Sequence, residues 1–90
     1  MSDFRVSLKK NLEDPEFKKE WINLEVEYQV QAELIRARLS CNMTQAELAE
    51  KSGVRQSNIS RIESGSAVPK LETLQTLARA MGKKLVISMV

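Results

Sequence analysis

The sequence contains no histidine and only one cysteine, Cys41. Without histidine, Ser-His and Cys-His nucleophile pairs and histidine-ligated metal sites are excluded. One cysteine cannot form a disulfide within the chain or a cysteine-rich zinc site, and it suits a reducing cytoplasm. We therefore predict neither an enzyme nor a cofactor-binding protein, and we expect Cys41 to be a small residue at a helix end.

Long apolar runs are also missing. No segment approaches the roughly 20 apolar residues that a membrane span needs, and the first residues lack the apolar stretch of a signal peptide. The chain has 90 residues, of which 42% are hydrophobic and 29% are charged, an ordinary mixture for one small folded domain. A core of this size gives modest stability unless a partner adds buried surface. We expect a cytoplasmic protein.

Charge is distributed unevenly along the chain. Residues 1–34 hold five basic and eight acidic side chains, a net charge of −3, whereas residues 35–90 hold nine basic and four acidic ones, a net charge of +5. The aromatic residues all lie in the acidic part: Phe4, Phe17, Trp21 and Tyr28. This asymmetry indicates two surfaces with different partners. The alternative is that one solvated face of a small domain is acidic.

The first third of the chain predicts a helix that follows a segment of undecided structure. Residues 4–12 fit a strand or a helix, because apolar residues recur there at spacings of both two and four. Asp14-Pro15-Glu16 is a helix start, with an acidic cap and proline at the first helical position. The helix either runs unbroken to about Ser40 or breaks near residues 23–24. Its apolar stripe consists of Phe17, Trp21, Leu24 and Tyr28.

The strongest local signal is a capping box at residues 44–47. The Thr44 hydroxyl can accept the backbone N–H of Glu47, while the Glu47 carboxylate accepts the N–H of Thr44. This box predicts a helix from Gln45 to about Lys51. A reversal with positive φ is then expected at Gly53, and another helix is predicted over residues 55–63, ended by a left-handed residue at position 65.

The remaining sequence predicts one more helix and a strand. Pro69 is predicted to open the helix and Gly82 to close it. Residues 84–90 are apolar and partly β-branched, so they predict a short C-terminal β-strand. The predicted fold class is therefore all-α, with an N-terminal helical extension and this short strand. The apolar face of the last helix contains Leu71, Leu74, Leu77, Ala78 and Met81.

Two of the predicted helices form a helix-turn-helix, joined across residues 52–54. Such a motif needs small or apolar residues where the helices cross, and Ala49, Val54 and Ile59 meet that need. It also needs side chains that reach base edges from the exposed start of the second helix. Three residues there have suitable side chains: Gln56, Ser57 and Arg61.

Residues 44–65 (TQAELAEKSGV, four residues, then ISRIESG) resemble the XRE family of Cro/repressor-type helix-turn-helix proteins. The resemblance covers roughly residues 34–82 and implies a lambda-repressor-like fold. The stretch DPEF at residues 14–17 and the ending at residues 82–87 resemble HigA-type antitoxins of type II toxin–antitoxin pairs. The expected organisation is an N-terminal extension (1–33, candidate toxin-binding), a helix-turn-helix DNA-binding domain (34–82) and a C-terminal strand (83–90, candidate dimerisation).

The resemblance implies roles for individual residues at the DNA. Gln56 would read adenine, Arg61 would read guanine or hold a phosphate, and Ser57 would make a lesser base contact. Gln45 would offer its side chain and backbone N–H to a phosphate, as helix N-termini favour. For Arg55, a solvated charge is the alternative to a phosphate contact. The predicted phosphate contacts are Thr44, Gln45, Arg55, Asn58 and Lys70.

The resemblance also implies contacts within and between copies of the chain. Arg38 and Glu63 match a pair that often forms a buried ion pair between the first and third helices of this family. A two-fold dimer on a palindromic operator is expected, with half-sites about one helical turn apart. The C-terminal strand would pair with its symmetry mate through Leu85, Ile87 and Met89, because a lone apolar edge strand is a liability. The alternative is pairing with residues 4–8 of the same chain.

Under the antitoxin hypothesis, the partner is a basic RelE/HigB-like ribonuclease toxin. Glu16 and Glu20 would complement its charge, and Phe17 and Trp21 would be apolar anchors. In the alternative interpretation, the aromatic residues pack on the first repressor helix, and for Tyr28 we favour this packing. The predicted function is an antitoxin that neutralises this toxin and represses its own operon. The alternative is a stand-alone XRE regulator, of phage-repressor or restriction-controller type, without a protein partner.

Overall fold

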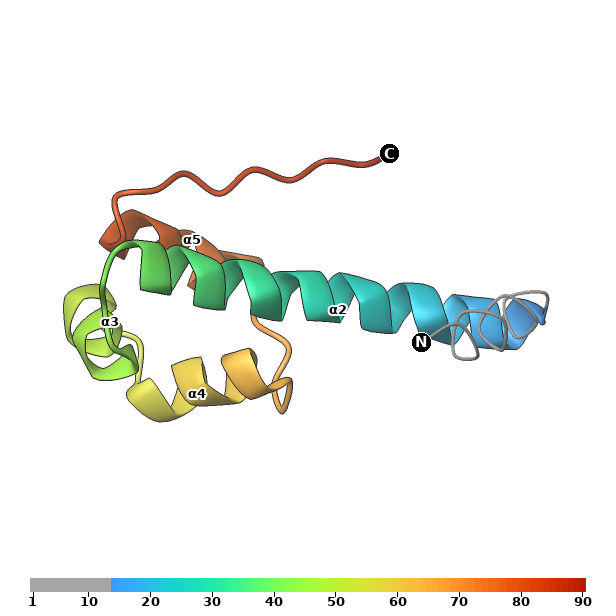
Figure 1. Ribbon diagram of the computed structural model, residues 1–90, viewed down its shortest axis with the longest axis horizontal. Coiled ribbons are helices and arrows are strands. Elements are labelled where there is room, and N and C mark those ends of the chain that lie inside the picture. The colour runs from blue at the N-terminus through green and yellow to red at the C-terminus, as the bar shows by residue number, and fades with distance from the viewer. Residues whose placement is uncertain (1–13) are drawn as a thin grey trace.

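Four helices and the loops that join them make up the described part of the chain, residues 14–90, in the computed structural model (Figure 1). In chain order they are α2 (Pro15–Ser40), α3 (Gln45–Ser52), α4 (Gln56–Ser64) and α5 (Leu71–Ala80). The predicted helical fold is confirmed over this range. Residues 4–12, for which strand and helix stayed open, lie outside the described residues.

α2 begins where the sequence predicts, with Asp14 as its cap and Pro15 as its first residue. The Asp14 side chain accepts a hydrogen bond from the Glu16 N–H at 3.0 Å. The helix continues past residues 23–24 to Ser40 without a break, so the unbroken alternative is confirmed. Its N-terminal half projects beyond the other helices (Figure 1). Within residues 14–90, no helix combines the length and apolarity needed to cross a membrane.

α3 begins and ends on local signals, and α4 ends on one. The capping box is present: Thr44 Oγ1 accepts the Glu47 N–H, and Glu47 Oε1 accepts the Thr44 N–H, both at 3.1 Å. α3 ends at Gly53, with φ of +78°, and α4 ends at Gly65, with φ of +82°. Glycine adopts this left-handed conformation without the steric cost that a Cβ brings. Both ends of α3 and the end of α4 are therefore set by nearby residues.

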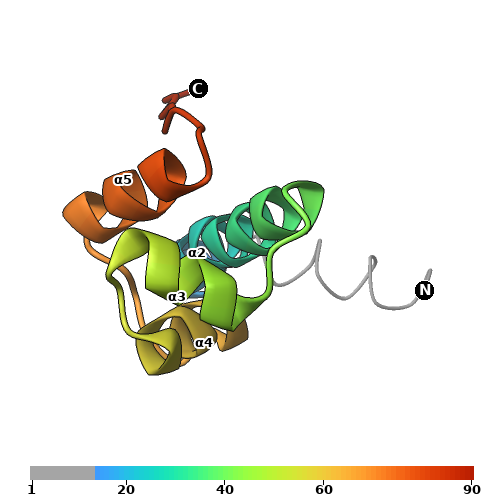
Figure 2. The same ribbon diagram turned by 90° about the vertical axis from the view of Figure 1, so that its left-hand side faces the viewer.

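All four helices contribute to one small core. Leu48 of α3, Ile62 of α4 and Leu77 of α5 are almost fully buried, as is Ile59, and Leu34 of α2 completes the cluster. Burial of one such aliphatic side chain contributes about 1.5–3 kcal/mol. Figure 2 views the bundle with α3 in front of α2, α5 above and α4 below. The core therefore fixes α4 against α2 and α3. Around it pack Met43, Ala49, Val54, Ala80 and Met81.

The predicted start of the last helix is wrong by two residues. α5 starts at Leu71, and Lys70 is its N-cap with extended backbone. Pro69 lies in the loop before the cap, where its fixed φ also suits an extended chain. The predicted end is confirmed: Gly82 follows α5 with φ of +68°, and the Lys83 N–H donates to the Ala78 carbonyl at 2.8 Å.

The predicted C-terminal β-strand is absent from the described residues. Residues 83–90 leave α5 as an extended segment without regular secondary structure (Figure 1). A strand is defined by hydrogen bonds to a neighbouring strand, and elsewhere in residues 14–90 the chain forms only helices and loops. The apolar, β-branched pattern therefore has no partner strand there. Val86, Ile87 and Met89 are exposed, whereas Leu85 is partly buried.

Candidate nucleic-acid interface

The first turns of α4 present a polar, cationic surface. Ile59 and Ile62 anchor the inner side of the helix in the core, which leaves its other side in solvent. This exposed surface carries the predicted base-contacting residues and two of the predicted phosphate contacts. A helix end with this composition is suited to the major groove, where amide and guanidinium groups read base edges. The exposed residues are Arg55, Gln56, Ser57, Asn58 and Arg61.

A shallow polar depression lies beside this surface. α4 and the turn before it contribute most of the lining, and Thr73 of α5 contributes the rest. Thr73 was not predicted, because its position in the sequence lies 12 residues beyond Arg61 and only the packing of α5 brings it there. The sequence signal for Thr73 is that it lies in the first turn of α5, three residues after Lys70, a predicted phosphate contact. The other lining residues are Val54, Arg55, Ser57, Asn58 and Arg61.

The start of α3 is arranged differently from the expectation for Gln45. Its side-chain amide does not point into solvent but donates to Glu63 Oε1 at 3.1 Å. The capping box meanwhile satisfies the N–H groups of Thr44 and Glu47. Within the described residues, the backbone N–H groups of Gln45 and Ala46 have no hydrogen-bond partner. These two groups at the positive end of a helix dipole are suited to a phosphate.

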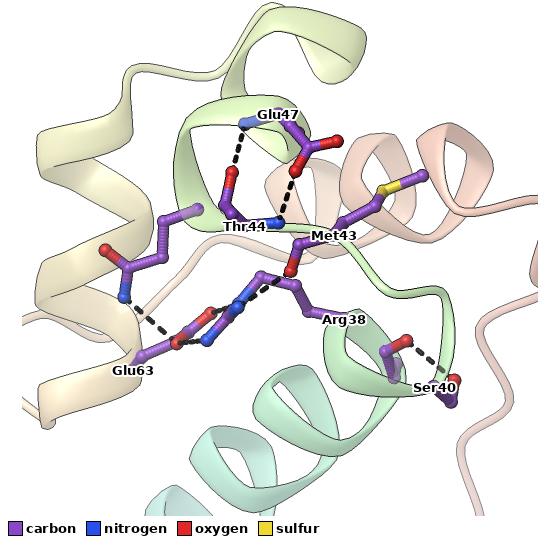
Figure 3. Close-up of polar contacts among 8 residues, drawn as sticks. Arg38, Ser40, Met43, Thr44, Glu47 and Glu63 are labelled. Carbon is purple, nitrogen blue, oxygen red and sulfur yellow. Dashed lines mark hydrogen bonds and ion pairs between the residues drawn. The ribbon is translucent and has the colours of Figure 1, made fainter.

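Arg38 and Glu63 form the ion pair that the family resemblance implies (Figure 3). Arg38 Nε donates to Glu63 Oε2 at 2.8 Å and Arg38 Nη2 donates to Glu63 Oε1 at 2.9 Å. Arg38 Nη1 also donates to the Met43 carbonyl at 2.9 Å. The two charged side chains are only 13% and 6% exposed. One buried cluster therefore joins α2, the loop before α3, and the end of α4.

Glu63 remains ionised in this cluster. Burial alone raises the pKa of its carboxyl group. The hydrogen bonds from Arg38 and Gln45, together with the charge of Arg38, outweigh burial and leave that pKa below its ordinary value. The hydrogen bond to Glu63 likewise raises the pKa of Arg38. Both partners therefore stay charged at neutral pH, and Glu63 can accept three hydrogen bonds at once.

The N-terminal half of α2 carries the candidate toxin-binding residues away from the helix-turn-helix. Glu16 and Glu20 are exposed, and Trp21 is partly exposed. The side chain of Phe17 lies outside what the structure describes. Tyr28 is 68% exposed, so its predicted packing on the first repressor helix is wrong. The physical reason is that α2 leaves the bundle there, and helical spacing of apolar residues does not specify what they contact.

Comparison with known proteins defines the class to which this arrangement belongs. The family described as helix-turn-helix matches residues 34–87, and the chain belongs to this helix-turn-helix family. The resemblance to XRE-type proteins inferred from residues 44–65 is confirmed. Membership follows from the same segment that contains α3, the turn and α4.

The curated relatives include an antitoxin and a transcriptional regulator. Antitoxin HigA1 of Mycobacterium tuberculosis is 39% identical over 72 residues, which cover 80% of this chain and 48% of the relative. An uncharacterized HTH-type transcriptional regulator of Haemophilus influenzae is 46% identical over 55 residues, covering 61% of this chain and 56% of the relative. The chain thus spans about half the length of these curated relatives.

A solved structure extends the likeness beyond the helix-turn-helix segment. The structure titled "Toxin-Antitoxin module from Streptococcus pneumoniae" superposes with a TM-score of 0.61 at 33% sequence identity, and the match covers 81% of both chains. The resemblance to HigA-type antitoxins is therefore supported by sequence and by fold. The chain is similar to an antitoxin-type helix-turn-helix regulator.

Proposed function

We propose that the chain is the antitoxin of a type II toxin–antitoxin pair, which neutralises a RelE/HigB-like ribonuclease and represses its own operon. One observation carries the proposal. A single helix, α2, packs its C-terminal half into the helix-turn-helix and extends its acidic N-terminal half away from that domain. The residue groups 1–33, 34–82 and 83–90 would then bind toxin, DNA and a second copy.

The DNA-binding part of the proposal rests on the exposed start of α4. Gln56, Ser57 and Arg61 would contact bases in the major groove, and Gln56 is suited to adenine through two hydrogen bonds. Phosphates would be held on either side of this helix, because exposed cationic side chains and helix N-termini occur there. For Gln45 we now assign this contact to the backbone N–H, since its side chain is bound to Glu63. The other proposed phosphate contacts are Thr44, Arg55, Asn58 and Lys70.

Dimerisation would place two such helices on a palindromic operator. One copy of α4 reads only a few base pairs, so two half-sites about one helical turn apart are needed for specific binding. The extended segment after α5 exposes apolar side chains that a second copy could cover. We assign this contact to Leu85, Ile87 and Met89.

Toxin binding would use the projecting half of α2. Glu16 and Glu20 would face basic residues of the ribonuclease, and Phe17 and Trp21 would supply apolar anchors. This assignment is supported by the toxin–antitoxin likeness in sequence and in structure. Operator binding and toxin binding would then use separate ends of one molecule.

One truncation tests both ends. The protein encoded by the adjacent reading frame is co-expressed with the full chain and with a variant lacking residues 1–24, and cell growth and operator affinity are measured. We expect the truncation to abolish protection from the toxin while operator affinity stays within about threefold, because the helix-turn-helix core begins at Leu34. Loss of both activities would mean that the extension belongs to the folding core and would contradict the proposal.

A stand-alone regulator is the second candidate, and the Haemophilus influenzae relative named as a transcriptional regulator favours it. The two functions differ in the neighbouring gene product. A small basic protein that arrests growth alone, and not in the presence of this chain, supports the antitoxin. A neighbour without any effect on growth supports the regulator.

A further inference from the structure

An apolar groove lies where α2 leaves the bundle, and none of its lining residues is among those assigned to DNA. It encloses about 90 Å³ between the middle of α2 and the loop that joins α4 to α5. In Figure 1 this loop rises from the end of α4 towards α2, beside the point where α2 begins to project. Neither the helix-turn-helix assignment nor the acidic extension explains the groove. Its apolar walls are Val26, Val30, Ala67, Val68, Pro69 and Leu74.

The groove is held open by contacts of the loop. The N–H groups of Ser66 and Ala67 both donate to the Arg61 carbonyl, at 2.8 and 3.2 Å, which fixes the loop on the end of α4. Gln31 of α2 lies against Gly65, where an added Cβ would come within 2.6 Å of its amide nitrogen. The buried side chain of Ile62 forms part of the lining. A partner would therefore meet a preformed surface and would not have to order it.

The outer edges of the groove are open to solvent. Val26 is 54% exposed on one side and Val68 is 73% exposed on the other. Two β-branched side chains facing solvent across an apolar groove form a surface that gains stability when it is covered. Their exposure also means that either one can be replaced without opening the core.

Charge on the α2 side of the groove favours a basic partner. Between Glu20 and Arg36, every charged residue of α2 is acidic: Glu25, Glu27 and Glu33. Glu27 itself lines the groove. Of the three, only Glu33 forms an ion pair within the described residues, with Arg36. An apolar side chain flanked by lysine or arginine is therefore the complement of this site.

We propose that the toxin-binding surface continues from the projecting half of α2 into this groove, where a basic partner inserts an apolar side chain between α2 and loop residues 65–69. The inference rests on the proposed antitoxin function and deepens it. Glu16, Glu20 and Glu27 follow one another at spacings of four and seven residues, so the acidic residues of the extension share a face of α2 with Glu27 in the groove. A second copy of this chain is the rival occupant, because Lys83 and Lys84 precede its exposed apolar tail.

The test introduces a positive charge, the same sign as the proposed partner's, at each edge of the groove. Val26→Lys and Val68→Lys are compared with Leu39→Lys, a matched control on α2 that is 58% exposed and lies outside the groove. The protein from the adjacent reading frame is the probe, and its Kd is measured by titration calorimetry. Sedimentation of each variant alone reports its oligomeric state, and unfolding by urea reports its folding.

We expect each groove variant to weaken probe binding at least tenfold, with Leu39→Lys within twofold of wild type and all three folded. Equal binding by all variants, or equal weakening in the control, would overturn the inference. A changed oligomeric state with unchanged probe affinity would assign the groove to a second copy and would also overturn it. If wild type itself fails to bind the probe, the proposed function falls together with this inference.

Discussion

Glu63 links the helix-turn-helix to α2 through hydrogen bonds of its side chain. Its carboxylate accepts hydrogen bonds from Arg38 on α2 and from Gln45 at the start of α3, while Glu63 itself belongs to α4. A buried carboxylate is costly unless it is paired, so each donor offsets part of its desolvation. The geometry of α3 relative to α4 is therefore set by a polar cluster as well as by the apolar core.

Removal of the arginine should expose this dependence. Arg38→Met leaves Glu63 without its ionic partner at a site that is nearly closed to solvent, and we expect a loss of about 3 kcal/mol in the free energy of unfolding. Arg36→Met is the control, because Arg36 and its partner Glu33 are 69% and 67% exposed. An exposed pair contributes less than about 1 kcal/mol. Urea denaturation measures both, and similar losses in the two variants would contradict this role for Arg38.

The same cluster predicts how stability depends on pH. The pKa of Glu63 is lower in the folded chain than its ordinary value, so the folded state binds the proton less readily than the unfolded state does. Its contribution is complete above the ordinary carboxyl pKa and is lost as the pH falls through the lower, folded value. Urea unfolding from neutral pH down to about pH 3 should show a smaller acid loss in Glu63→Gln than in wild type. If the free energy of unfolding falls equally with pH in both proteins, other carboxylates cause the loss of stability in acid.

Base reading by Gln56 is tested by a matched pair of substitutions. Gln56→Ala removes two hydrogen bonds that an adenine would receive or donate, and we expect a loss of about 1–3 kcal/mol on the operator with relaxed preference at one base position. Gln75→Ala makes the same change on the exposed side of α5 and should leave affinity unchanged. Binding is measured on operators with each base pair altered in turn. If Gln56→Ala discriminates between base pairs as well as wild type at every operator position, Gln56 does not contact a base.

Residue-level prediction succeeded where the cause was local. The Thr44–Glu47 box, Gly53 and Gly65 are each determined by neighbours within a few residues, and the structure has all three. The pairing of Arg38 with Glu63 spans 25 residues and could be expected only through the family resemblance. The third member, Gln45, was assigned to a phosphate alone, because no spacing rule connects its side chain to a carboxylate at the end of α4.

At the scale of elements, α3 is the helix whose stability depends most on its cap. It has eight residues, a length at which an isolated helix is not stable in water. Its start is fixed by the capping box and its end by Gly53 in the left-handed conformation. Because the free N–H groups of Gln45 and Ala46 lie in this first turn, fraying would remove the candidate phosphate site as well.

The cap can be removed without touching the core. Thr44→Ala should lower the free energy of unfolding by about 1 kcal/mol and weaken operator binding, since it releases the Glu47 N–H. Thr76→Ala is the matched control: its hydroxyl donates to the Glu72 carbonyl inside α5, where alanine is the better helix former. Thermal unfolding and operator titration measure both variants. Equal losses of stability and operator affinity in Thr44→Ala and Thr76→Ala would contradict a specific role of the Thr44 cap.

Elements were predicted well where their ends carry signals and poorly where they need a partner. The sequence predicts the start of α2 at Asp14 and Pro15 but does not decide its continuity past residues 23–24, because both alternatives preserve the same apolar spacing. The strand over residues 84–90 was wrong, since β-propensity describes a residue's fit to a sheet and residues 14–90 provide none. Pro69 was misplaced because proline suits both the first helical position and the preceding loop.

For the whole molecule, the segment after α5 predicts the state of association. Successive side chains of an extended chain point to opposite sides, so Leu85, Ile87 and Met89 share one side. Serine at these three positions should convert a dimer into a monomer and weaken operator binding at least tenfold. Serine at Val86 and Val90, on the other side, is the control. Sedimentation equilibrium measures the association, and dimers in both variants would contradict the assignment.

α2 also has the length and continuity of a rigid spacer. At about 1.5 Å per residue, its 26 residues span roughly 39 Å, and neither glycine nor proline interrupts it after its first residue. A protein bound to the N-terminal half of α2 would therefore hold a fixed position and orientation relative to DNA bound at α4. One residue inserted into the projecting half would turn the residues before it by about 100° about the helix axis relative to α4. The number of residues in α2 would therefore decide whether two toxin-bound dimers fit side by side on neighbouring operators.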